Sequence, residues 1–165
     1  MTPIELLKDA FGRVVESGTA AVDGLTDDQL THRVGPQANT IAWLVWHATR
    51  VQDDHIADVA GTEQVWTSQG FVGQFGLPFD EGATGYGQSA DEVGQVHASA
   101  ELLTEYLKAT HEATLAYLDT LSEADLDEVV DERWDPPVTL AVRLVSVVND
   151  DTQHVGQAAF VRGLL

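Results

Sequence analysis

The chain has 165 residues, enough for a hydrophobic core, and we expect one domain over residues 1–165. Its 27 acidic and 8 basic residues leave a net charge of −19, which argues against binding to nucleic acid or to an anionic membrane. The absence of cysteine excludes disulfides, zinc–thiolate sites and a catalytic thiol. We see no signal peptide and no apolar run of membrane-spanning length, so the expected location is cytoplasmic.

The N-terminal segment has the pattern of a helix start. Thr2 suits the N-cap, Pro3 suits the first turn, and Glu5 completes a capping box. Apolar residues then recur at helical spacing, which predicts a helix that ends between Gly18 and Gly24.

A second long helix is predicted after a short turn. Residues 25–30 have the pattern of a capped turn of helix, and apolar periodicity predicts a helix from residue 39 or 40 to Gly61. Residues 62–97 hold seven of the 14 glycines together with several aromatic residues. We therefore expect a long ordered connection there, and such loops are often functional.

The second half of the chain repeats this arrangement. A helix is predicted over residues 99–121, residues 121–126 repeat the pattern of residues 25–30, and a last helix begins near Thr139 and continues to the C-terminus. We find no set of strands. Two helical hairpins of this kind predict an all-α protein, a four-helix bundle.

Two of the predicted helices carry side chains that could bind a metal. Asp150 and His154 are four residues apart, so they share one face of the last helix, and His47 lies on the second long helix. Asp151 is the alternative carboxylate, because it also shares a face with His154. His55 lies about 12 Å along the axis from His47, too far to bind the same ion.

The chain resembles the DinB/YfiT-like superfamily of metalloenzymes. The resemblance covers nearly the whole chain and is carried by residues 25–30, by residues 38–47 and by the run Asp150-x-x-x-His154-Val-Gly-Gln-Ala. It implies a four-helix bundle with a long crossover between the second and third long helices. It also implies a divalent metal, and the residues that match its ligand positions are His47, Asp150 and His154.

Position 150 departs from the family pattern. Many members have histidine there, and members related to mycothiol-dependent isomerases have glutamate. Asp150 keeps the carboxylate of the second group but is shorter by one methylene. Two imidazoles and one carboxylate suit Zn, Fe(II), Ni or Mn, and three protein ligands leave positions open for substrate, as in catalytic sites.

Three further residues are candidates for contact with a substrate or cosubstrate. Trp46 adjoins His47 and could line a pocket, although a core position is its ordinary role. Arg50 could bind an anionic substrate, and its alternative is a surface pair with Asp53 or Asp54 on a solvated face. Gln153 precedes His154 and could contact the site or lie on the surface.

These features predict a metal-dependent enzyme acting on a small molecule. The leading hypothesis is a thiol S-transferase that uses a low-molecular-weight thiol, with mycothiol favoured and bacillithiol used by relatives; hydrolysis is a chemical variant. The alternative is a non-catalytic, stress-associated protein that binds a metal or ligand, or a structural dimer without metal. Exposed helix faces, several tryptophans and the resemblance all favour a homodimer with a mostly uncharged interface.

Overall fold

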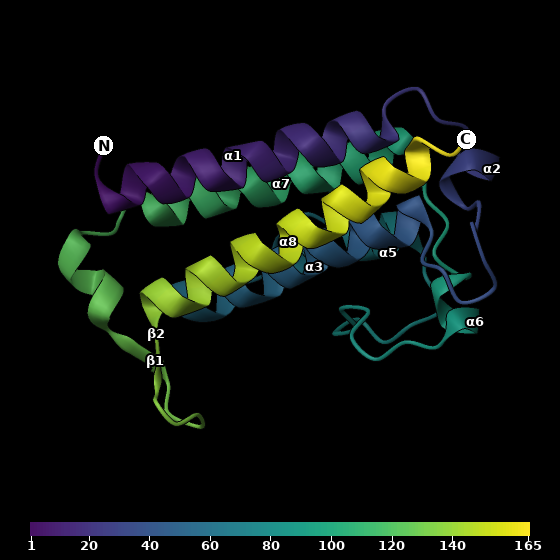
Figure 1. The fold of residues 1–165 in the computed structure, drawn as a ribbon. Helices are drawn as coiled ribbons and strands as arrows, with labels where there is room; N and C mark the ends of the chain where they lie inside the picture. The colour runs from purple at the N-terminus through teal and green to yellow at the C-terminus, as the bar shows by residue number, and fades with distance from the viewer.

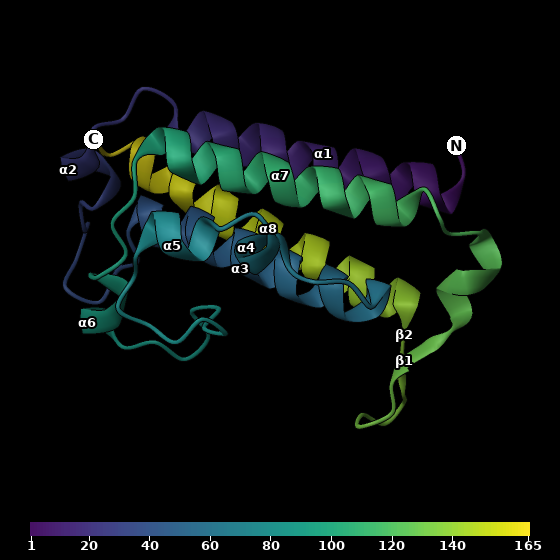
Figure 2. The same cartoon turned by 180° about the vertical axis from the view of Figure 1, so that it is seen from behind.

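The computed structural model describes residues 1–165, and its four long helices form a bundle (Figure 1). They are α1 (Pro3–Val22), α3 (Ile41–Ala60), α7 (Ala100–Leu118) and α8 (Leu140–Arg162). Both α1 and α3 pack mainly against α7 and α8. Helices α1 and α8 run in one direction, and α3 and α7 run in the opposite direction (Figures 1 and 2). The predicted four-helix bundle with a long crossover between α3 and α7 is confirmed.

A hydroxyl side chain caps the N-terminus of each long helix. The oxygen accepts a hydrogen bond from the backbone N–H three residues later, and the capping residues are Thr2, Thr40, Ser99 and Thr139. Each cap contributes about 1 kcal/mol to stability. At the other end of α3, Gly61 adopts a left-handed conformation that ends the helix. The predicted starts of these helices therefore agree with the structure to within about two residues.

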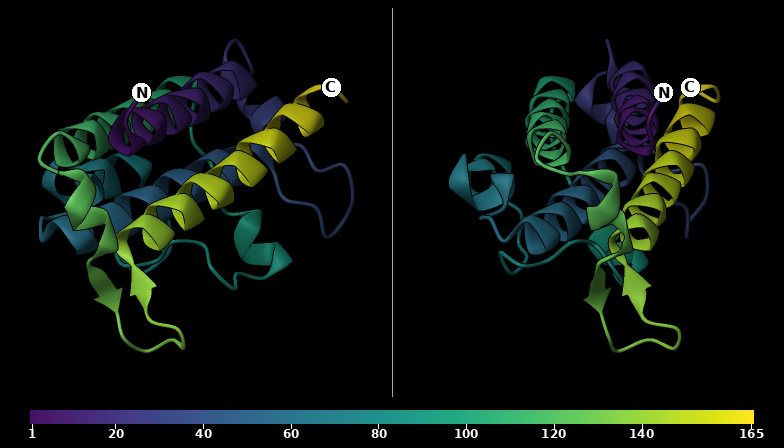
Figure 3. Two further views of the ribbon diagram at one scale, coloured as in Figure 1. Left: turned by 60° about the vertical axis from the view of Figure 1, so that its left-hand side comes forward. Right: turned by 90° about the vertical axis from the view of Figure 1, so that its left-hand side faces the viewer.

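Shorter elements occupy the connections. They are α2 (Asp27–Leu30), α4 (Val65–Ser68), α5 (Phe71–Phe75), α6 (Ala90–Val93), the 3-10 helix η1 (Glu123–Asp127), β1 (Val129–Asp131) and β2 (Val138–Thr139). The strands form an antiparallel hairpin in which Val129 is paired with Thr139, and the hairpin projects from the bundle where α8 begins (Figure 3). The expectation of no strands was wrong, because strands of three and two residues are too short to show an alternating pattern.

Two hydrophobic clusters fill the bundle. The larger contains Trp43, Trp46 and Tyr106, and the crossover adds Phe71 and Phe75 to it; the smaller lies at the end where α1 and α8 begin. Along α3 and α8, buried polar side chains lie between the residues of the two clusters. The crossover packs against α3 and α7, and it covers one face of α3.

None of the helices combines the length and the apolar character needed to cross a membrane.

Candidate metal centre

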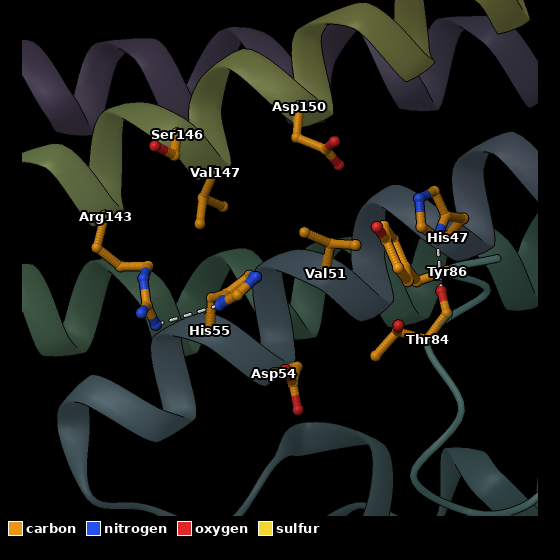
Figure 4. A pocket seen from close by; sticks show the side chains of 10 residues that line it. All are labelled: His47, Val51, Asp54, His55, Thr84, Tyr86, Arg143, Ser146, Val147 and Asp150. Carbon is orange, nitrogen blue, oxygen red and sulfur yellow. Dashed lines mark hydrogen bonds between the residues drawn. The ribbon is translucent and has the colours of Figure 1, made fainter. Parts of the chain in front are cut away.

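The antiparallel packing of α3 against α8 brings three potential metal ligands together. One ligand atom from each of His47, Asp150 and His154 lies within 4.8 Å of the others. The imidazole rings of His47 and His154 have centroids 4.7 Å apart. His47 and Asp150 face each other from the two helices at one end of a cavity (Figure 4). The predicted ligands, which come from two helices, therefore lie close together in the structure.

His47 is held as a neutral imidazole. Its side chain is buried, and burial lowers its pKa, because the charged form loses solvation. Its Nδ1 lies 2.5 Å from the carbonyl oxygen of Thr84, which only accepts hydrogen bonds, so Nδ1 carries the proton. The lone pair is then on Nε2, which is the form that binds a metal.

Asp150 is held as a carboxylate. The neighbouring His154 imidazole is the main cause of its lowered pKa. Metal ligands must be deprotonated, and both shifts therefore favour the binding forms at neutral pH.

Two atoms of the cluster lack hydrogen-bond partners. Oδ2 of Asp150 and Nδ1 of His154 are both buried and unpartnered, and Nε2 of His154 lies 3.6 Å from Oδ2 of Asp150, beyond hydrogen-bond length. Buried polar atoms are normally paired, so these atoms fit a bound cation. The donor set of two nitrogens and one oxygen suits Zn, Ni, Fe(II) or Mn, with positions left open for another ligand.

Asp151 has a different environment from Asp150. It is fully buried in the bundle, and burial together with the nearby charge of Asp150 raises its pKa well above the ordinary value. This environment therefore favours the neutral carboxylic acid, whereas a metal ligand must be ionised. The structure places Asp150, not Asp151, in the cluster with the two histidines.

A cavity of about 410 Å³ opens beside the cluster. His47 and Asp150 lie at one end of it, and His55 and Arg143 lie at the other (Figure 4). The remaining lining residues are Val51, Asp54, Thr84, Tyr86, Ser146 and Val147. The cavity therefore joins a potential metal site to a second polar end across an apolar middle.

Arg143 is a cavity residue that sequence reasoning missed. Its Nη1 lies 3.3 Å from both His55 and Asp58, and its Nη2 lies 3.4 Å from Asp131 in the hairpin. Burial and the charge of Arg143 lower the pKa of His55. The seven-residue spacing between Arg143 and Asp150 could have indicated this, because residues seven positions apart share one face of a helix.

The three predicted substrate contacts do not line this cavity. Trp46 is buried in the larger hydrophobic cluster, where its ring packs near Trp66 and Phe79. Gln153 is exposed and donates a hydrogen bond to the backbone carbonyl of Asn149. Arg50 is fully buried and faces the crossover, so it is not available to a ligand in the cavity.

Asp53 also differs from its expected surface position. It is 4% exposed, and its two oxygens accept hydrogen bonds from the backbone N–H groups of Val65 and Trp66. The hydroxyl of Tyr106 donates a further bond to it. The expectation of a solvated face was wrong here, because the crossover folds over this side of α3.

Comparison with known proteins places the chain in a family. The model of a family described as Mycothiol-S-transferase matches residues 6–165. A solved structure described as that of the conserved protein of locus from Enterococcus faecalis is 31% identical, with a TM-score of 0.92 over 99% of this chain and 97% of that chain. No curated protein sequence matches the chain.

Proposed function

The chain belongs to the mycothiol-S-transferase family of the DinB/YfiT-like superfamily, and on this premise we propose that it is a metal-dependent thiol S-transferase. The observation that carries the proposal is the group of His47, Asp150 and His154 beside a cavity of about 410 Å³. The thiol is a small cosubstrate, with mycothiol favoured by the family, because the chain itself has no cysteine. The acceptor is a small electrophile.

His47, Asp150 and His154 would hold the metal, and the remaining cavity residues would hold the two substrates. A bound divalent ion stabilises a coordinated thiol as its thiolate at neutral pH. The thiol proton passes to solvent, the sulfur electron pair forms a new C–S bond to the acceptor, and the leaving group departs with the electron pair of the bond that breaks. Val51 and Val147 line the middle of the cavity, where the acceptor would lie.

The proposed location is the cytoplasm, because low-molecular-weight thiols are kept reduced there. The charge of −19 is compatible with neither nucleic acid nor an anionic membrane as a partner.

The test combines metal binding and turnover. Untagged protein is analysed for metal, stripped, titrated with Zn, Ni, Mn and Fe(II), and assayed for conjugation of mycothiol to a small electrophile. We expect about one ion per chain. Asp150→Ala should lose both metal and turnover, whereas Asp150→Glu should retain the metal because it restores a carboxylate.

Two outcomes would contradict the proposal. If no ion binds more tightly than about millimolar, the chain has no functional metal site. If an ion binds but no thiol is transferred, the chain is a non-catalytic metal-binding bundle instead.

We further propose that the protein is a homodimer formed through α8. The exposed positions of this helix carry no charged residue, although the whole chain has a net charge of −19. Exposed apolar side chains lie along it and just beyond its end, at Val142, Val145, Phe160 and Leu164. An uncharged face is where two copies of an acidic chain repel each other least.

Light scattering at low and high salt measures the oligomeric state. We expect twice the chain mass for the parent and a monomer for Val145→Asp, because a charge on the face would be buried between two copies. A mass near 17.8 kDa for the parent at both salt concentrations would refute the dimer.

A further inference from the structure

The crossover contributes one polar atom to the metal centre. Residues 81–88, here called the strap, follow the outer side of α3, and the Thr84 carbonyl within it accepts the hydrogen bond from Nδ1 of His47. The strap contains neither helix nor strand over residues 83–85, so its position depends on side-chain contacts. These contacts determine where the Thr84 carbonyl lies.

Three side chains of the bundle and crossover hold the strap. Nε of Arg50 donates a hydrogen bond of 3.1 Å to the carbonyl of Ala83, the residue before Thr84. Two indole N–H groups fix the strap on either side: Trp66 donates to the Glu81 carbonyl at 3.1 Å, and Trp43 donates to the Gln88 side chain at 2.7 Å.

Arg50 is itself immobilised. It is fully buried, and its Nη1 lies 2.7 Å from Gln64 Oε1, 3.3 Å from the Tyr106 hydroxyl and 3.7 Å from Asp53 Oδ2. Its guanidinium carbon lies 5.0 Å from the centre of the Trp66 ring. A guanidinium held on several sides presents its Nε–H to the strap in one direction.

Gly85 allows the strap to approach His47. Its φ of +96° is in the region that favours glycine, and a Cβ atom there would lie 2.7 Å from Nδ1 of His47. The same atom would lie 3.0 Å from Trp46 and 3.2 Å from Trp43. Any side chain at this position therefore pushes the strap away from the His47 imidazole.

We propose that Arg50 and Gly85 are positioning residues for His47. Together they place the Thr84 carbonyl against Nδ1, which fixes the imidazole orientation and leaves Nε2 unprotonated toward Asp150. A hydrogen bond to the far nitrogen of a ligating histidine typically changes metal affinity 10–100-fold. The metal part of this inference rests on the proposed function, whereas the tautomer of His47 does not.

The experiment compares Gly85→Ala with Gly87→Ala. Both glycines have positive φ, but a Cβ at Gly87 meets no atom within 4 Å, so this variant carries the backbone strain without displacing the strap from His47. Nitrogen-15 NMR of metal-free protein reports the His47 tautomer, and calorimetric titration with Zn²⁺ reports affinity. We expect Gly85→Ala to lose the Nδ1–H tautomer and to bind Zn²⁺ about 10–100-fold more weakly, with Gly87→Ala like the parent.

Arg50→Lys is the second variant. It keeps a positive charge near Asp53 but loses the Nε–H group that bonds Ala83, so the same two changes are expected. Gln64→Met is its control, because it removes another partner of Arg50 and leaves the bond to Ala83 in place.

The two readouts separate the two hypotheses. If the parent lacks the Nδ1–H tautomer, or if Gly85→Ala retains it, the positioning inference is overturned. If the tautomer behaves as expected but the parent binds no metal, the positioning role stands and the proposed function fails.

Discussion

Helix α3 carries two buried polar clusters that differ in how well their atoms are paired. In the first, Asp53 accepts three hydrogen bonds, and the guanidinium of Arg50 bonds a backbone carbonyl and two side chains, which leaves only its Nη2 without a partner. In the second, around His47, buried atoms of Asp150 and His154 have no partner. Paired atoms stabilise a particular chain arrangement, whereas unpaired atoms beside an opening are available to a ligand.

An unpaired buried atom is not by itself a ligand site. Both oxygens of Asp151 lack partners, yet this residue does not line the cavity, and burial raises its pKa, which favours the neutral form. Asp150, one position earlier, is ionised and lines the cavity. The combination of ionisation, access and missing partners distinguishes the cluster around His47.

The largest expected effect on stability is in the cluster of Arg50 and Asp53. Asp53→Ala leaves the Arg50 charge without its carboxylate and three donors without an acceptor, so the free energy of unfolding should fall by about 3–5 kcal/mol. Asp54→Ala is the matched control, since its half-buried carboxylate accepts one side-chain hydrogen bond and should cost about 1 kcal/mol. Urea unfolding measures both, and equal losses would contradict the comparison.

The cluster around His47 should respond in metal affinity instead. His154→Ala removes a proposed ligand. Zn²⁺ affinity should therefore fall by more than the roughly 100-fold that is typical when a residue hydrogen-bonded to a metal ligand is replaced. His111→Ala, which changes a histidine outside the cluster, should leave affinity unchanged. Without metal, His154→Ala should destabilise the chain less than Asp53→Ala does. A His154→Ala protein that binds Zn²⁺ like the parent would remove this residue from the site.

A smaller effect on stability is expected near the far end of the cavity. There, Asp131 accepts hydrogen bonds from Arg133 and from Arg143, which lines the cavity. Bonding to Arg133 is the main cause of its strongly lowered pKa. The resulting stability is therefore present above the unfolded-state pKa of about 3.9 and is lost as the pH falls toward the lower folded-state value.

Asp131→Asn tests this pH dependence. The stability difference between the parent and this variant should be largest near pH 7 and should shrink as the pH falls below about 3.9. Chemical unfolding near pH 7 and below a pH of about 3.9 measures this difference. A difference that grows in acid would show that the Asp131 carboxylate is not stabilising the hairpin.

Local sequence patterns determined the long helices and the shared helix face of two of the three potential metal ligands. Hydroxyl caps at Thr2, Thr40 and Thr139 and the apolar periodicity act within a few residues, so they can be read from sequence. The four-residue spacing of Asp150 and His154 places them on one helix face whatever the rest of the chain does.

Only the tertiary structure decided which polar residues of α3 are covered. Arg50 and Asp53 have the spacing of a surface ion pair, but the crossover packs over them and supplies their partners. The contact between His47 and Thr84 joins residues 37 positions apart, and no periodicity in either segment specifies it. Helical periodicity shows which side chains share a face, whereas their burial depends on the distant segment that folds over that face.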